Sequence, residues 1–281
     1  MKIKDILLPL TSYPMPTEAR SIENAVVLAK RMGAQMSAIA FAMDIESLVG
    51  LFADPIGASG ILAADRKKSA DNASDILSLF EMSGARHGIV FDHSLLHCNP
   101  LDVPQRVVEE ARFYDVTIVA LREGDAAWQD IAARLVFESG RPIVVYPDDA
   151  NRELALPLEN VAVAWDFSGP STRAITDALP LLQEAKQVRV FTVVDDKLIA
   201  KSRSGERLAK HLARHGAEVS IEDVKSEGRA IGSVFQAYVS EHNIDLLVMG
   251  AYGHSQMREY ILGGATRSIL SRPPTWVLLA R

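Results

Sequence analysis

Apolar residues in this chain gather in short continuous runs that alternate with longer amphipathic stretches, and the alternation occurs twice. Each half opens with an apolar run that ends in a polar turn, starting at Asp5 and at Asn160. An alanine-rich helical stretch follows (Thr17–Met32 and Pro170–Ala185), and then a β-type run (Gln35–Phe41 and Gln187–Val194). Strands that alternate with helices predict βαβ units. Continuous apolar strands are typical of a parallel sheet with helices on both faces.

The repeat extends to the end of each half. Arg112–Ala120 matches His242–Gly250, which aligns Asp115 with Asp245, and each half closes with a helix and a proline-led strand. We predict five strands and four helices per half, with the polar stretch Pro147–Pro157 as linker and domains at 1–147 and 158–281. The first half also carries an insertion, Asp44–Gly60, which the sequence leaves open as a lid, a contact surface or a packed connection.

Composition narrows the class of protein. The chain has 281 residues, is 48% hydrophobic and carries a net charge of −6 without a lysine or arginine run. Nucleic acid is therefore not expected as a partner, because binding the phosphate backbone needs a concentrated basic surface. One cysteine, Cys98, fits a reducing compartment. No apolar stretch approaches the roughly 20 residues that span a membrane, so we expect a cytoplasmic protein with no membrane partner.

The most informative stretch is Ile244–Leu270. An apolar run, Ile244–Met249, is followed by Gly250 and Gly253, and nine residues later by Gly263 and Gly264 at the start of a helix. Glycines allow backbone amides to approach a ligand closely, and the first turn of a helix offers free N–H groups and the positive end of its dipole to a phosphate. Spacing alone leaves two alternatives open: a phosphate site, or a turn and a helix without a ligand.

The glycine spacing, Gly-x2-Gly-x9-Gly between a strand and a helix, resembles the nucleotide signature of the universal stress protein family. The turn Ala164–Trp165–Asp166 is similar to the family's first strand, which ends in an aspartate, and Ile6–Leu10 resembles that strand in the first half. The whole chain thus resembles a tandem universal stress protein.

This resemblance implies an α/β fold with two similar domains related by a pseudo-twofold axis. Each domain would be an open five-stranded parallel sheet with helices on both faces, Rossmann-like and adenine nucleotide alpha hydrolase-like. The closing strands, Ile143–Tyr146 and Thr275–Leu279, would pair or pack across the axis. ATP or another adenine nucleotide, with or without Mg²⁺, would bind at the carboxyl ends of the strands, where open α/β sheets take their ligands.

Site residues follow from the resemblance by position. Those near the nucleoside would be Asp166 and the main chain of Val193. Those near the ribose and phosphates would be Gly250 and Gly253, with Gly263 and Gly264 at the terminal phosphates. His254, inside the loop, would contact the nucleotide or face water.

One signature position departs from the family. Gly264 stands where the family has serine or threonine, so the hydroxyl that would meet a phosphate oxygen is missing. Thr266, in the first helical turn, is a candidate replacement, and Arg267 could instead supply charge. The alternative is that Thr266 only caps or lines the helix start and Arg267 faces solvent.

The first half departs further from the signature. Thr11 stands where the second half has Asp166, the stretch Ala120–Trp128 lacks the paired glycines, and alanines (Ala132, Ala133) occupy the helix start. We therefore predict a degenerate first half and a nucleotide site in the second.

Patterns for common enzyme classes are absent from the sequence: the P-loop, Gly-x-Gly-x-x-Gly after a strand, and Gly-x-Ser-x-Gly. We therefore assign no catalytic residue. The clusters around His93 and His97 and around His211 and His215 are interpreted as surface residues, which leaves no metal ligand set. The chain is interpreted as a stress-response regulatory protein that binds an adenine nucleotide. A slow ATPase at the same site and a ligand-free interaction module are the alternatives, and a homodimer or an unidentified protein partner is compatible with each.

Overall fold

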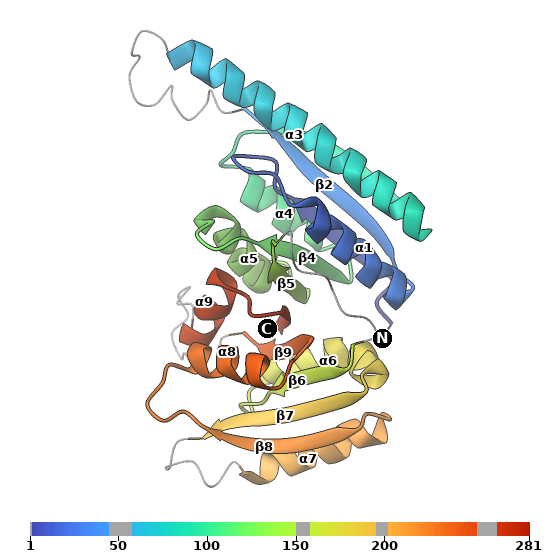
Figure 1. Cartoon of the computed structure of the whole chain (residues 1–281), viewed down its shortest axis with the longest axis vertical. Coiled ribbons are helices and arrows are strands. Elements are labelled where there is room, and N and C mark those ends of the chain that lie inside the picture. Colours follow the sequence, from blue (N-terminus) through green and yellow to red (C-terminus); the bar gives the residue numbers. More distant parts are fainter. Residues whose placement is uncertain (1, 45–57, 150–157, 195–201, 252–262) are drawn as a thin grey trace. The chain divides into compact units, whose positions relative to one another are not determined.

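The computed structural model describes residues 2–44, 58–149, 158–194, 202–251 and 263–281, and within them each half supplies five strands and four helices (Figure 1). The counts match the prediction from the hydrophobic pattern. By their internal contacts the residues form two compact units, which are described in turn.

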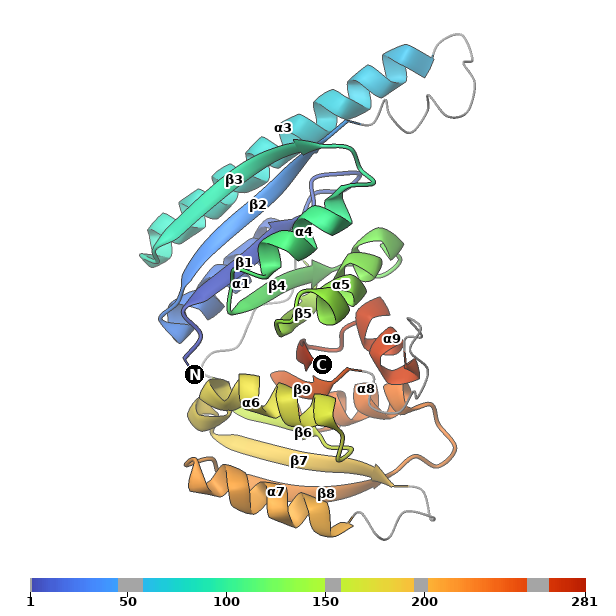
Figure 2. The same ribbon diagram turned by 180° about the vertical axis from the view of Figure 1, so that it is seen from behind.

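The first unit is a parallel sheet in the order β3-β2-β1-β4. Helices α1 and α3 cover one face and α4 the other (Figures 1 and 2). The strands are β1 (Asp5–Leu10), β2 (Gln35–Met43), β3 (Phe91–Cys98) and β4 (Val116–Leu121). The helices are α1 (Ala19–Met32), α3 (Ala58–His87) and α4 (Val103–Ala111).

The second unit contains six strands in the order β5-β10-β9-β6-β7-β8. All neighbours are parallel except β5 and β10, which are antiparallel. The strands are β5 (Ile143–Pro147), β6 (Asn160–Ala164), β7 (Gln187–Val194), β8 (Val219–Lys225), β9 (Leu246–Gly250) and β10 (Trp276–Ala280). The helices are α5 (Ala126–Glu138), α6 (Gly169–Glu184), α7 (Ser202–Arg214), α8 (Ile231–Glu241) and α9 (Gly264–Ser271).

The closing strands of the two halves pair with each other, as the resemblance implied. Val277 lies opposite Val145 in the β5–β10 ladder, and the Tyr146 and Trp276 rings stack at 4.1 Å. Residues Leu121–Pro147 therefore belong to the second compact unit although they come from the first half of the sequence. The domain limits at 1–147 and 158–281 stay a prediction that follows the sequence repeat rather than these contacts.

An aspartate performs the same structural role in both halves, at the positions that the sequence repeat aligned. Each carboxylate accepts two backbone N–H groups at the start of the first strand of its half: Asp115 from Lys4 (2.8 Å) and Asp5 (3.2 Å), and Asp245 from Glu159 (2.8 Å) and Asn160 (2.9 Å). The repeat is thus visible in side-chain chemistry as well as in the order of the strands.

Strand β6 is the topological switch point of the second unit. The chain runs from β6 outward to β7 and β8, then returns to β9 on the other side of β6 and continues to β10. Right-handed crossovers consequently put α6 and α7 on one face and α8 and α9 on the other, as Figures 1 and 2 show. Ligands of such sheets bind at the carboxyl ends of the strands beside the switch point.

Element limits agree with the sequence pattern to within a few residues. Strand β7 spans the predicted residues, whereas the helix predicted from Thr17 begins at Ala19. Of the insertion, residues 45–57 lie outside the described part, and α3 begins at Ala58. Among the described helices, none has the length and apolar character required to cross a membrane.

Candidate nucleotide site

A cavity of about 450 Å³ lies at the carboxyl ends of β6, β7 and β9, between the first turns of α8 and α9. It therefore occupies the switch point. Its walls are mostly apolar, and Asp166 is the one ionisable side chain among the described lining residues. These residues are Ala164, Trp165, Asp166, Phe191, Val193, Ala230, Ile231, Gly232, Ser233, Phe235, Met249, Gly250, Gly263, Gly264, Ala265, Thr266 and Ser268.

The turn after β6 fixes the position of Asp166. Its Oδ1 accepts the Ser168 N–H at 3.0 Å, and the Ser168 hydroxyl in turn caps α6 by accepting the Ser171 N–H at 3.2 Å. Trp165 is held from the other side, because its Nε1–H donates to the Ser204 Oγ of α7 at 3.0 Å. These hydrogen bonds thus fix the positions of the Asp166 carboxylate and the Trp165 indole in the cavity wall.

Gly250 is required by packing within the protein. A Cβ at this position would come within 2.6 Å of the Pro170 carbonyl carbon and closer still to the Ser171 nitrogen, both in the backbone of α6. This backbone cannot move aside as a flexible side chain could. The structure therefore explains the glycine at position 250 by close packing against α6, whereas the sequence suggested close approach of a ligand.

Gly263 and Gly264 are in the opposite situation. A Cβ added to either residue would meet nothing within 4 Å, and neither has a positive φ. Neither packing nor backbone conformation in the described structure requires glycine here. Gly263 is the N-cap of α9, and the described residues supply no side-chain cap for this helix. The first-turn N–H groups, which precede the helical bonding pattern, thus have no capping partner among the described residues.

Thr266 lies in that first turn and lines the cavity with only 2% of its surface exposed. The structure gives its hydroxyl no hydrogen-bond partner among the described residues. Arg267 is exposed and is not among the described lining residues. Of the two candidates for the missing hydroxyl, only Thr266 faces the cavity in the described structure.

Helix α8 supplies a wall that the sequence prediction missed. Its N-cap is Ala230, and Ile231, Gly232 and Ser233 line the cavity. A Cβ at Gly232 would collide with the Ser268 side chain, so this glycine allows α8 to pack closely on α9. The signal available in the sequence was two glycines: Gly228, in the turn after β8, and Gly232, in the first turn of α8.

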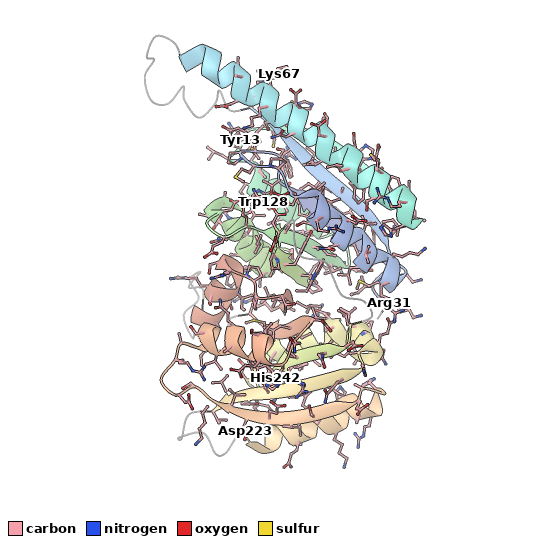
Figure 3. All side chains as sticks on the ribbon, in the orientation of Figure 1. Tyr13, Arg31, Lys67, Trp128, Asp223 and His242 are labelled. Carbon is pink, nitrogen blue, oxygen red and sulfur yellow. The ribbon has the colours of Figure 1, made fainter. Side chains whose placement is uncertain are left out.

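The far side of α8 is anchored to the sheet by a polar cluster. Glu222 accepts hydrogen bonds from Arg189 Nη1 (2.8 Å) and from Tyr238 OH (2.9 Å). The Nε2 of His242, which is labelled in Figure 3, lies 3.7 Å from the same carboxylate. Burial and the bond to Glu222 raise the pKa of the Tyr238 phenol. Tyr238 also stacks on Phe191 at 4.1 Å, and Phe191 lines the cavity. The cluster therefore fixes α8 relative to the cavity wall.

Comparison with known families identifies this half of the chain. Residues 157–281 match the model of the Universal stress protein family. The second half is a universal stress protein domain. The cavity is thus formed within this domain, at the signature glycines that the match covers.

Solved structures extend the likeness in fold to the whole chain. A universal stress protein from Archaeoglobus fulgidus DSM 4304 is 16% identical, covers 100% of this chain and 99% of its own, and has a TM-score of 0.70. A putative universal stress protein from Pseudomonas aeruginosa UCBPP-PA14 is 12% identical, with 99% and 93% covered and a TM-score of 0.60. No curated protein matches the chain. The tandem arrangement and the α/β fold predicted from the sequence are confirmed.

Six of the eight predicted site residues of the universal stress protein domain line one cavity: Asp166, Val193, Gly250, Gly263, Gly264 and Thr266. The other two, Gly253 and His254, lie outside the described residues. Whether these residues bind a nucleotide stays a prediction. In the described part of the chain, no group of three or more histidine, cysteine or acidic side chains is placed to hold a metal ion.

The equivalent place in the first half carries side-chain hydrogen bonds of its own. Aligning the strand pairs of the two halves puts Thr11 at the position of Asp166 and Phe41 at that of Val193. The Ser12 hydroxyl donates to the Phe41 carbonyl at 2.5 Å, and the Ser69 hydroxyl lies 3.5 Å from Ser12 Oγ. The Phe41 carbonyl, which aligns with the main chain of Val193, thus accepts a hydrogen bond within the protein. That the first half is degenerate stays a prediction.

Proposed function

We propose that the universal stress protein domain binds an adenine nucleotide in the cavity between β6, β9, α8 and α9. We further propose that the chain acts as a regulatory protein of the stress-response type. Three features support a nucleotide ligand: the position at the switch point, the apolar walls with one carboxylate, and the open first turn of α9.

The observation that carries the proposal is the open space beside Gly263 and Gly264. Glycine is tolerated at an N-cap such as Gly263, but a second glycine at the first helical position costs conformational entropy, and no contact in the described structure accounts for it. Close approach of a ligand to the backbone would account for it, and free N–H groups at a helix N-terminus suit a phosphate. Gly250 does not support a ligand in the same way, because close packing against the α6 backbone already accounts for the glycine at this position.

In the proposed complex the aromatic and aliphatic wall, with Phe191 and Val193, takes the base. Asp166 accepts a hydrogen bond from the nucleoside, and the first turn of α9 takes phosphate. The Thr266 hydroxyl takes the role of the serine or threonine that Gly264 replaces. A charge-assisted hydrogen bond of this kind contributes about 1.5–3 kcal/mol.

Equilibrium binding by calorimetry tests the proposal. ATP, ADP and AMP are titrated into the full chain with and without Mg²⁺, with GTP as the control for base recognition. We expect an adenine nucleotide to bind and GTP to bind more weakly. Absence of binding by every adenine nucleotide at millimolar concentration would contradict the proposal and favour a ligand-free interaction module. Release of phosphate from ATP above that of a Gly263→Val variant would establish a slow ATPase at this site.

A further inference from the structure

A smaller cavity in the second unit is lined by three arginines that are far apart in the sequence. It has a volume of about 130 Å³ and lies where the end of β10, the turn before β5 and helix α6 meet. The arginines are Arg141, Arg173 and Arg281, and Asp177 is the one acidic residue among the described lining residues. None of these four residues belongs to the described wall of the cavity at the switch point.

The pairing of the closing strands brings two of these arginines together. In the antiparallel β5–β10 ladder, Leu279 lies opposite Ile143. The same register, continued by two residues, puts Arg281 opposite Arg141. Like charges directly opposite each other in an antiparallel pair are destabilising. An anion close to both guanidinium groups would offset this repulsion.

Contacts within the unit hold both arginines in place. The Arg281 guanidinium lies over the Phe137 ring, 4.4 Å from its centroid, which is a favourable arrangement for a cation. The turn that carries Arg141 is held by Ser139, whose hydroxyl donates to the Leu135 carbonyl at 2.5 Å and accepts the Arg141 N–H at 3.1 Å. Donors that are positioned in advance lose less entropy when a ligand binds.

Arg173 adds a third guanidinium group from α6. Its Nε donates to Asp177 Oδ2 at 2.8 Å, one helical turn further along the chain. The Asp177 side chain is only 15% exposed, so this ion pair is largely shielded from solvent. The bond involves one of the five N–H donors of the guanidinium group and fixes the orientation of the group at the cavity.

The size and charge of the cavity favour one small oxyanion. Guanidinium groups bind phosphate oxygens through paired N–H···O bonds. With three arginines and one aspartate, the described wall carries two more positive than negative charges, and a phosphate group carries about −1.5 to −2 at pH 7. The volume of about 130 Å³ is below the range of roughly 300–1,000 Å³ that is typical of sites for larger ligands.

We propose that Arg141, Arg173 and Arg281 form a binding site for one phosphate group, supplied by inorganic phosphate or by a phosphate monoester. The guanidinium groups donate to the phosphate oxygens, and the anion reduces the repulsion between Arg141 and Arg281. Because these two arginines flank the β5–β10 ladder, the bound anion stabilises the pairing of the closing strands. The site goes beyond the proposed function and does not depend on it.

Thermal unfolding of the full chain in inorganic phosphate tests the site. A ligand that binds only the folded chain raises the Tm by mass action, so we expect the Tm to rise with phosphate and to rise less with sodium chloride at the same ionic strength. O-phosphoserine is the probe for a monoester. A rise with both compounds supports a site that is open to monoesters, and a rise with phosphate alone supports a site for the free ion. Equal effects of phosphate and chloride would overturn the proposal.

Variants separate binding at the arginines from the general stabilisation that phosphate gives by exclusion from protein surfaces. Arg173→Gln and Arg281→Gln each remove one guanidinium group, and the phosphate affinity should fall about tenfold or more. Arg134→Gln is the matched control, because Arg134 Nε also donates to an aspartate one turn away (Asp130 Oδ2, 2.8 Å) but lies outside the described cavity wall. The rise in Tm should persist in Arg134→Gln alone. The same rise in all three variants, each folded by circular dichroism, would overturn the proposal.

A fourth variant distinguishes this site from the cavity at the switch point. Gly264 lines only the latter among the described residues, so the effect of phosphate on the Tm should persist in Gly264→Val. Loss of the effect in Gly264→Val with retention in Arg281→Gln would assign the anion to the cavity at the switch point and overturn the proposal. Neither result depends on whether a nucleotide binds.

Discussion

The glycines of the signature loop differ in function, and substituting them separates packing from ligand binding. Gly264→Val adds a side chain where a Cβ meets nothing within 4 Å. The difference in helix propensity between glycine and valine is below about 1 kcal/mol, so we expect the free energy of unfolding to stay within that range. Gly250→Ala forces a Cβ against the α6 backbone, and overpacking of this kind costs about 1–3 kcal/mol or more.

For nucleotide affinity, in contrast to stability, we expect Gly264→Val to have a large effect. The valine of Gly264→Val stands between the first turn of α9 and the phosphate, so we expect the loss of one or two charge-assisted hydrogen bonds at about 1.5–3 kcal/mol each. The affinity for AMP should fall at least tenfold. Gly169→Val is the matched control: Gly169 also begins a helix and also has open space at its Cβ, but it lies outside the described cavity wall.

The assays are urea unfolding followed by circular dichroism and calorimetric titration of AMP, on wild type and the three variants. The reasoning requires that Gly264→Val loses affinity without losing stability, that Gly250→Ala loses stability, and that Gly169→Val keeps both. It would be refuted if Gly264→Val bound AMP as well as wild type does, or if Gly250→Ala were as stable as wild type.

Three further predictions concern the fold around the site. Asp245→Ala leaves two backbone N–H groups of the β6 start without an acceptor and should cost about 1–3 kcal/mol in urea unfolding, whereas Asp245→Asn, which keeps an acceptor oxygen, should cost less. Ser168→Ala removes the cap of α6 and should cost about 1 kcal/mol, with Ser168→Asp within a few tenths of wild type. The raised pKa of Tyr238 means that the Tyr238 phenol stabilises the fold fully below the ordinary tyrosine pKa of about 10, and that this stabilisation is lost as the pH rises toward the folded-state pKa. Wild type should therefore lose more stability than Tyr238→Phe when the pH becomes alkaline. Equal losses in the two proteins would show that Tyr238 does not cause the pH dependence.

Sequence periodicity was sufficient for the architecture because the strands are buried on both faces. Continuous apolar runs such as Val161–Ala164 mark such strands, and the aligned aspartates Asp115 and Asp245 marked the repeat before their common hydrogen bonds were visible. That the closing strands β5 and β10 pair or pack together could be stated only through the family resemblance, and their antiparallel direction was not predicted. Strand partners depend on the sheet order, which local patterns do not contain.

The site was predicted less completely, because it too depends on contacts between segments that are distant in the sequence. The signature glycines are close in sequence, whereas the α8 start reaches the cavity only because the chain returns from β8 to β9 across the sheet. Gly250 matched the motif, yet its neighbour is the α6 backbone some 80 residues earlier, as the positions of Gly250 and Ser171 show. The Ser12 hydroxyl donates a hydrogen bond to the Phe41 carbonyl in the first half. Ser12 belongs to no motif, so the sequence did not indicate this contact.

A crystal structure of the full chain grown with AMP would test the central claim most directly. The account predicts electron density for the nucleotide in the cavity at the switch point, with the base against Phe191 and Val193 and the phosphate at the N-terminus of α9. A nucleotide bound elsewhere, or this cavity without a nucleotide at saturating AMP, would contradict it.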